Sequence, residues 1–215
     1  MQTKPSMDKQ TWLTNICQYS GLFITGTDTG IGKTWVGKQL IQALKQQGRR
    51  IDARKPVESG WQSDIKQTDA WQLAQAAENP LEHVCHYRLA APLAPPRAAT
   101  LENLRLTLGD LSKACYTHHE QPHLLYVEGA GGFYSPIAHD GLNADLAQKL
   151  NLPIILISEN RLGCINHILL IAEAIAQRQL ILAGVILNTI QPIPNAMDNA
   201  TDLANYLTTT PIIVW

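Results

Sequence analysis

Residues 26–34 of this chain read Gly26-Thr27-Asp28-Thr29-Gly30-Ile31-Gly32-Lys33-Thr34. A short apolar run precedes this stretch, and a helical pattern follows it. A glycine-rich turn between a strand and a helix, closed by Lys-Thr, predicts a P-loop, where backbone N–H groups and a helix N-terminus surround phosphates. Five residues separate Gly26 from Gly32, one more than in the common GxxxxGK[ST] form. The stretch therefore predicts a nucleotide-binding α/β protein.

Short apolar runs alternate with helical segments along the rest of the chain. Strands that are apolar throughout, separated by helices, predict a doubly wound, mostly parallel sheet with helices on both faces, here a P-loop NTPase fold. Residues 88–99 contain three prolines and are expected to be irregular. The expected strands are 22–25, 51–54, 124–127, 154–157, 185–187 and 212–214, and the expected helices are 35–47, 67–77, 110–119, 143–150, 164–177 and 198–207.

Length and composition indicate one globular domain. The chain has 215 residues, of which 45% are apolar and 16% charged. Seventeen basic and eighteen acidic residues give a net charge of −1, so neither nucleic acid nor an anionic membrane is an expected partner. No apolar run reaches the roughly 20 residues of a membrane helix. We expect the domain to span residues 21–215, after a flexible extension of residues 1–20.

The extension is polar and lacks the apolar core of a secretion signal. Met7 is an alternative start. The four cysteines are far apart and form no CxxC pair, which argues against a zinc site or a disulfide framework. Free thiols suit a reducing compartment, so a cytoplasmic location is expected.

Ligands of open parallel sheets bind beyond the carboxyl ends of the strands, and polar residues follow two expected strands there. Lys55 comes after residues 51–54 and would lie near the γ-phosphate; the alternative is a surface lysine. Glu128 ends residues 124–127, as a Walker B carboxylate does, and the glycines after it allow close backbone approach; the alternative is a charged strand end. Asp69 lies in the first turn of an expected helix. Its carboxylate is interpreted as a metal ligand; the alternative is a partner of the helix dipole.

Two later segments also follow strands. Arg161-Leu162-Gly163-Cys164-Ile165-Asn166-His167 lies where a strand passes into a helix, and a helix N-terminus beside an arginine suits a carboxylate. Cys164 is expected to pack rather than react, and His167 to lie on the helix surface. Asn188 ends a strand, where its amide has the groups to bind adenine edges; the alternative is a turn-forming asparagine.

In combination, these segments resemble the dethiobiotin synthetase family. The similarity runs from about residue 22 to residue 207. Its specific parts are Lys55-Pro56-Val57-Glu58-Ser59-Gly60, Val127-Glu128-Gly129-Ala130-Gly131-Gly132 and Leu162-Gly163-Cys164-Ile165-Asn166-His167, with Pro92-Leu93-Ala94-Pro95 and Asn188. A P-loop alone would be a weak signal, whereas this order of segments is specific.

The resemblance implies an ATP-dependent ligase of biotin biosynthesis. Its substrates would be 7,8-diaminopelargonate, CO₂ and ATP, and its product dethiobiotin, formed through a carbamate and a carbamic-phosphoric anhydride. It also implies Mg²⁺ as cofactor and a homodimer whose substrate site lies near the subunit boundary.

The resemblance further implies roles for individual residues. Catalysis would fall to Lys33, Lys55, Thr29 and Ser59. Thr34, Asp69 and Glu128 would hold Mg²⁺, while Ser59, Gly163, Cys164, Ile165 and Asn166 would bind the diamine substrate. The nucleotide would contact Gly30, Ile31, Gly32, Lys33, Thr34, Trp35, Asp69, Glu128, Gly129, Ala130, Gly131, Asn188 and Thr189.

Two departures from the family pattern set further expectations. Arg161 stands where some members have lysine, which would change contacts to the substrate carboxylate. The family usually continues past its last strand with a Gly-x-[Ile/Leu]-Pro segment beside adenine, whereas this sequence ends at Trp215. We therefore expect base selectivity to rest largely on Asn188 and to be weak.

A regulatory ATPase of the MinD/ParA class is the main alternative. That class carries an additional lysine five residues before the P-loop lysine, a position occupied here by Asp28. A GTPase would need Asn-Lys-x-Asp, but the sequence at Asn188 is Asn-Thr-Ile-Gln. A cobyrinate-type amidotransferase would need a glutaminase domain to supply ammonia.

Overall fold

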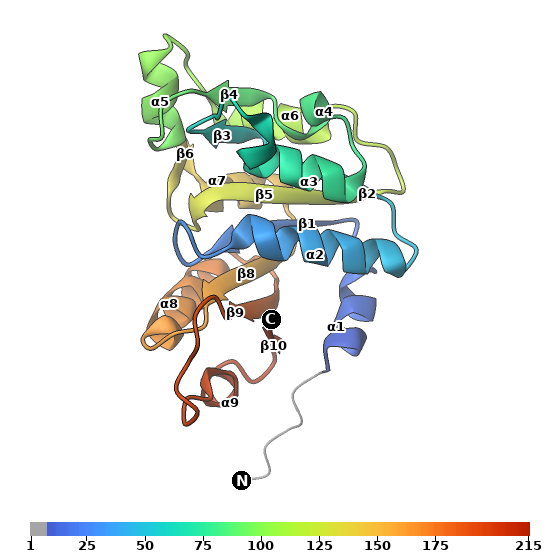
Figure 1. Cartoon of the computed structure of the whole chain (residues 1–215), viewed down its shortest axis with the longest axis vertical. Helices are drawn as coiled ribbons and strands as arrows, with labels where there is room; N and C mark the ends of the chain where they lie inside the picture. Colours follow the sequence, from blue (N-terminus) through green and yellow to red (C-terminus); the bar gives the residue numbers. More distant parts are fainter. Residues whose placement is uncertain (1–7) are drawn as a thin grey trace.

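The computed structural model describes residues 8–215, so the expectations for residues 1–7, including a start at Met7, lie outside it. Its centre is one six-stranded sheet, ordered β10-β9-β8-β1-β5-β2, in which every neighbouring pair is parallel (Figure 1). The strands are β1 (Gly21–Gly26), β2 (Ile51–Arg54), β5 (Leu124–Gly132), β8 (Ile154–Glu159), β9 (Leu182–Asn188) and β10 (Ile212–Val214). This confirms the doubly wound α/β prediction.

Helices cover both faces of the sheet. Successive residues of a strand point to opposite sides, so each apolar strand contributes side chains to the core on both faces. Leu22 and Ile24 of β1 face one cluster, while Phe23 between them faces the other. The first cluster packs under α1 (Lys9–Ile16), α2 (Lys33–Gln46), α3 (Asp69–Ala77) and α4 (Leu81–Val84). The second lies under α5 (Pro95–Leu101), α6 (Leu108–Tyr116), α7 (Asn143–Leu150) and part of α8 (Cys164–Gln177), and a third joins α8 to α9 (Asn199–Ala204).

Two small sheets lie outside the central one. β3 (Val57–Ser59) pairs in parallel with β4 (Tyr87–Leu89), and β6 (Pro136–Ala138) forms an antiparallel pair with β7 (Gly141–Leu142). A short 3₁₀ turn, η1 (Ile65–Gln67), precedes α3. Among residues 8–215, none of the helices combines the length and apolarity needed to cross a membrane.

The expectation that residues 88–99 are irregular was wrong. Tyr87–Leu89 is a strand, and Pro95 and Pro96 occupy the first turn of α5. Proline is tolerated there because first-turn N–H groups have no partner within the helix and its fixed φ already suits helical backbone. The prolines therefore start this helix instead of preventing it.

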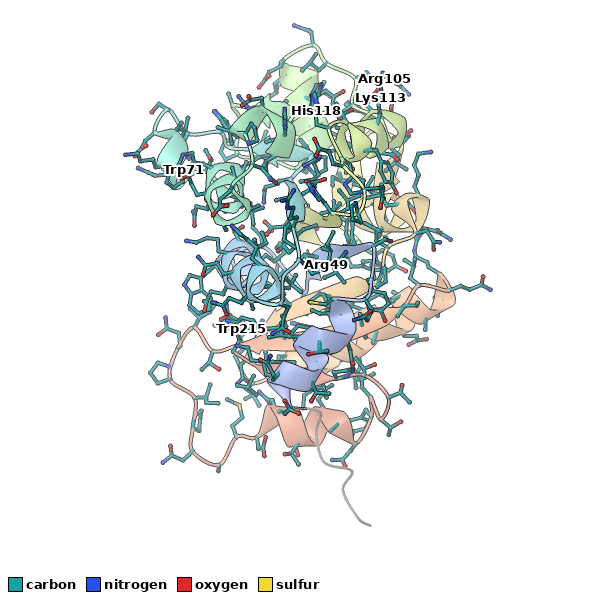
Figure 2. The ribbon with its side chains drawn as sticks, turned by 90° about the vertical axis from the view of Figure 1, so that its right-hand side faces the viewer. Arg49, Trp71, Arg105, Lys113, His118 and Trp215 are labelled. Atoms are coloured by element: carbon teal, nitrogen blue, oxygen red, sulfur yellow. The ribbon has the colours of Figure 1, made fainter. Side chains whose placement is uncertain are left out.

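Part of the extension expected at residues 1–20 forms a helix in the described portion of the chain. Residues Lys9–Ile16 form α1, which Asp8 caps by accepting a hydrogen bond from Thr11 N at 3.0 Å. Trp12 is fully buried, and its indole N–H donates to Ala183 O of β9 at 2.9 Å. The Lys9 ammonium lies over the ring of Trp215, 3.3 Å from its centre. Figure 2 shows Trp215 beside α1 and α2. This helix is part of the packed core.

We expect Trp12→Ala to lower the free energy of unfolding by about 3–5 kcal/mol, because it leaves a cavity over β9 and removes a buried hydrogen bond. Urea denaturation measures the change. Tyr206→Ala, at an exposed position of similar chemistry, serves as the control and should stay within about 0.5 kcal/mol of the original chain. Equal stabilities for Trp12→Ala and the original chain would contradict the packing described for α1.

Candidate active site

The P-loop joins β1 to α2, and two of its glycines have left-handed backbone. Gly30 has φ +76° and Gly32 has φ +80°, a region that residues with a Cβ rarely adopt. Lys33 turns back over the loop, where its ammonium donates to Asp28 O at 2.8 Å. Burial lowers the pKa of Lys33, although the charge of Glu128 opposes this shift. The loop thus encloses a buried cation at the start of α2.

Both 14-residue helices, α2 and α8, begin after a glycine and have no side-chain cap. Gly32 precedes α2, and Gly163, with φ +88°, precedes α8. The first N–H groups of a helix lack partners within it and carry partial positive charge. These two helix starts follow the adjacent strands β1 and β8, so both lie at the carboxyl edge of the sheet.

The glycine-rich end of β5 lies directly against the P-loop. Phe133 N donates to Gly26 O at 3.2 Å, and a Cβ on Gly131 would stand 3.7 Å from Thr29 Oγ1. Asn143, the first residue of α7, holds this strand end: its amide donates to Ala130 O at 2.6 Å and to Gly132 O at 3.0 Å. Sequence reasoning gave Asn143 no role, because its partners come from tertiary packing.

An ion-pair network occupies the space between β2, β5 and α3. The Lys55 ammonium lies 2.8 Å from Glu128 Oε1 and 2.8 Å from Asp69 Oδ2. Thr34 Oγ1 donates to the same Glu128 oxygen at 2.7 Å. Lys55 and Glu128 are buried, while the Asp69 side chain is 43% exposed. The structure therefore brings together Thr34, Lys55, Asp69 and Glu128, with Lys33 close by.

The charges of this network are mutually stabilised. Burial alone would lower the pKa of Lys55, but the carboxylates of Glu128, Asp69 and Glu58 together raise it, so the amine stays protonated. Burial would raise the pKa of Asp69, but Lys55 holds it below its ordinary value. Lys55 is not the surface lysine that the sequence left open as an alternative.

Glu58 is a second residue that sequence reasoning missed. Its carboxylate accepts hydrogen bonds from Asp69 N at 2.9 Å and Ala70 N at 2.8 Å. It thus caps the first turn of α3 and fixes the residue whose side chain pairs with Lys55. Burial raises the pKa of Glu58, and the charge of Lys55 opposes that shift. The available signal was its place in the segment Lys55-Pro56-Val57-Glu58-Ser59-Gly60.

The other expected site residues lie around this network. Asn188 is buried and donates to Ile31 O at 2.9 Å, so it braces the P-loop from β9. Thr189 Oγ1 accepts from Asn160 at 3.2 Å. Ser59 ends β3, and Trp35 is half exposed on α2. Cys164 is buried, Ile165 is partly buried, and Asn166 and His167 are exposed on α8.

The oxygen atoms at the network fit Mg²⁺. Thr34 Oγ1, Asp69 Oδ2 and Glu128 Oε1 converge, and the second Glu128 oxygen is buried with no hydrogen-bond partner in the described part of the chain. Within residues 8–215 no cluster of three or more His, Cys, Asp or Glu side chains is arranged to hold a metal. Two carboxylates and a hydroxyl are nevertheless the donors that Mg²⁺ uses when phosphate oxygens and water complete its shell.

A parallel α/β sheet with a P-loop between β1 and α2 and a strand-end glutamate beside it defines a P-loop nucleotide-binding protein. A family model described as an AAA domain matches residues 20–213.

Curated relatives named "ATP-dependent dethiobiotin synthetase BioD" are similar over most of their length. The one from Anaeromyxobacter dehalogenans (strain 2CP-1) is 38% identical over 188 residues, 86% of this chain and 84% of the relative. The one from Janthinobacterium sp. (strain Marseille) is 41% identical over 197 residues, 85% and 81% of the two chains. The one from Phenylobacterium zucineum is 42% identical over 178 residues, 79% and 76%. The chain belongs to the dethiobiotin synthetase family, as the sequence segments indicated.

We expect Glu58→Ala to lower the free energy of unfolding by about 1–3 kcal/mol, because two N–H groups of α3 lose a charged acceptor. Urea denaturation again gives the value. Glu82→Ala, an exposed glutamate in the first turn of α4, is the matched control and should change stability by no more than about 0.5 kcal/mol. Equal losses for the two variants would mean that Glu58 does not cap α3.

Proposed function

We propose that this chain catalyses the ATP-dependent carboxylation and ring closure of 7,8-diaminopelargonate with CO₂, giving dethiobiotin, ADP and phosphate. The name shared by its relatives supports this choice of substrate. The observation that carries the proposal is the buried contact of Lys55 with Glu128 and Asp69, beside the P-loop residues Lys33 and Thr34. A phosphoryl-transfer site needs cations and metal-binding oxygens at this position.

Three steps complete the reaction. An amine of the substrate attacks CO₂ and loses a proton, which gives a carbamate. A carbamate oxygen then attacks the γ-phosphorus of ATP, and ADP leaves as the carbamic-phosphoric anhydride forms. The second amine attacks the anhydride carbon, loses its proton and expels phosphate, which closes the cyclic urea. Each step needs positioning and charge stabilisation more than acid–base catalysis by the protein.

In this scheme, Lys33 and Lys55 stabilise negative charge on the transferring phosphoryl group and the carbamate. Thr29 and Ser59 lie near the reacting groups. Backbone N–H groups of residues 30–35 face the phosphates, and Asn188 and Thr189 border the base. Gly129, Ala130 and Gly131 let the backbone approach the nucleotide closely, while the Ala130 N–H itself donates to Asn143 Oδ1 at 3.1 Å. Thr34, Asp69 and Glu128 would hold Mg²⁺, which when bound would neutralise charge on the phosphate oxygens.

For the substrate carboxylate, we propose the start of α8. Gly163 and Ile165 offer backbone N–H groups at an uncapped helix N-terminus, with Arg161 and Asn166 at its margins. The N–H of Cys164, between them, donates to Arg161 O at 3.1 Å, so Cys164 would have to exchange this partner to bind the carboxylate. Leu162 is 85% exposed and Leu170 is 60% exposed on the same segment, which supports a homodimer whose boundary lies beside this site. The four cysteines are buried free thiols, which supports a cytoplasmic location.

The deciding assay is phosphate release that depends on diaminopelargonate, with ATP, Mg²⁺ and bicarbonate present. Glu128→Gln keeps the side-chain volume of Glu128 but removes its charge, so it should abolish this release. ATP hydrolysis that proceeds equally well without the diamine would instead favour a MinD/ParA-like ATPase.

Loss of the Lys55 charge should lower kcat by about 10²-fold or more, while the dissociation constant for ATP changes far less, because the charge acts mainly in the transition state. Lys55→Met tests this, since it keeps the length of the side chain. Lys38→Met is the control, because Lys38 lies on α2 and contacts Gln72. An unchanged kcat in Lys55→Met would remove Lys55 from the catalytic groups.

The chain should sediment as a dimer at assay concentration, and Leu162→Asp should weaken both association and turnover, with activity rising at higher protein concentration. Leu104→Asp introduces the same charge at an exposed leucine far along the chain and should leave both unchanged. A fully active monomer would refute the proposed site at the subunit boundary.

A further inference from the structure

Two buried oxygens beside the ion-pair network lack hydrogen-bond partners in the described residues. They are Glu128 Oε2 and the hydroxyl oxygen of Tyr126. Both side chains are fully buried. Tyr126 and Glu128 are two positions apart on β5, so their side chains leave the same face of the sheet. An unpaired buried polar atom is costly, and two neighbouring ones call for a common explanation.

Gly37 of α2 faces both oxygens. A Cβ on Gly37 would overlap the Tyr126 hydroxyl and would stand 3.2 Å from Glu128 Oε2. Both oxygens therefore lie close to one point on the helix surface, and so close to each other. A glycine inside a helix weakens it relative to alanine, and φ of Gly37 is not positive, so the backbone does not need a glycine here. A glycine is required at position 37 because the Tyr126 hydroxyl occupies the space that a Cβ would take.

We infer that Tyr126 is a positioning residue for Glu128: its hydroxyl donates a hydrogen bond to Oε2, by a small rotation or through one water. The other oxygen, Oε1, is then left to Thr34 and Lys55, which already contact it. With both oxygens held, the carboxylate cannot turn about its last bond. Oε1 thus stays directed at the point where Thr34 and Asp69 converge.

The acceptor and donor roles agree with the electrostatics. The phenol hydroxyl of Tyr126 has one proton to donate, and Glu128 Oε2 has no other donor among the described residues. The charged group beside it is Glu128, whose other oxygen pairs with Lys55. A neutral donor therefore faces a buried anion, which is a strong type of hydrogen bond.

This inference rests on the proposed Mg·ATP site, and Tyr126→Phe in the full chain tests it. Titration calorimetry with a non-hydrolysable ATP analogue should show Mg²⁺-dependent affinity weakened about tenfold, as expected for one hydrogen bond to a charged group. Affinity for the analogue in EDTA should not change. In steady-state kinetics, the KM for Mg²⁺ should rise more than kcat falls. Tyr116→Phe, which removes a partly exposed hydroxyl, is the control.

Gly37 allows a rescue experiment that separates hydrogen bonding from packing. In Tyr126→Phe, the hydroxyl that excludes a Cβ from position 37 is gone. Gly37→Ser added to Tyr126→Phe supplies a new hydroxyl near Glu128 Oε2 and should restore the Mg²⁺-dependent affinity. Gly37→Ala in the same background adds the carbon without the donor and should not.

The outcomes are distinct. The role of Tyr126 would be overturned if Tyr126→Phe kept the Mg²⁺-dependent affinity of the original chain. It would also be overturned if Gly37→Ser and Gly37→Ala restored that affinity equally. Either result would leave the proposed function standing. An original chain that binds the analogue no better with Mg²⁺ than with EDTA would refute the proposed function, and the positioning role with it. Loss of Mg²⁺-dependent affinity in Tyr126→Phe, with recovery in the Gly37→Ser double variant but not in the Gly37→Ala one, supports both the positioning role and the proposed function.

Discussion

The Lys55 ammonium between Glu128 and Asp69 is the contact on which the rest of the site depends. It joins β2, β5 and α3 through side chains that are far apart in sequence and 2.8 Å apart in space. A buried ion pair of this kind is weak evidence for stability, because removing its charges from water is costly. It does enforce geometry, since any arrangement that separates the partners leaves a charge without compensation. The positions of Thr34 and Glu58 follow from it, as each contacts a member of the pair.

The elements that could be predicted from the sequence are those specified by local physics. The strand before the P-loop and the helix after it follow from apolar periodicity and from Gly30, Gly32 and Lys33, and residues 164–177 were predicted with the bounds that α8 has. Lys55, Asp69 and Glu128 could be proposed as neighbours, because the carboxyl ends of parallel strands share one edge of the sheet. Uninterrupted apolar runs also predicted β1, β5 and β8 correctly, since a strand buried on both faces is apolar throughout.

The missed features depend on tertiary contacts. Trp12 is unremarkable in a polar segment until Ala183, 171 positions away, accepts its indole N–H. The sequence around Glu58 indicates only a loop residue, whereas in the structure the first N–H groups of α3 donate to its carboxylate. β6 has three residues and β7 has two, too few for an alternating pattern to be recognised. Pro95 and Pro96 were interpreted as helix-breaking residues. Proline breaks a helix in its interior but is tolerated in its first turn, and the sequence does not mark clearly where this helix begins.

The balance of charge in the site explains why nucleotide and cation would bind together. The charges of Glu128 and Asp69 act on both Lys33 and Lys55, while Asp28 acts on Lys33 and Glu58 on Lys55. Four carboxylates thus surround two ammonium groups. The local excess is negative, and the triphosphate of ATP is itself highly anionic, so a nucleotide without a cation would meet repulsion despite the helix N-terminus. A divalent cation at the converging oxygens would offset that excess. In the proposed mechanism, Lys55 would then share its carboxylates with the cation and pair with them less completely. Its ammonium would already be buried beside a developing anion, so it would not have to lose a water shell during the reaction.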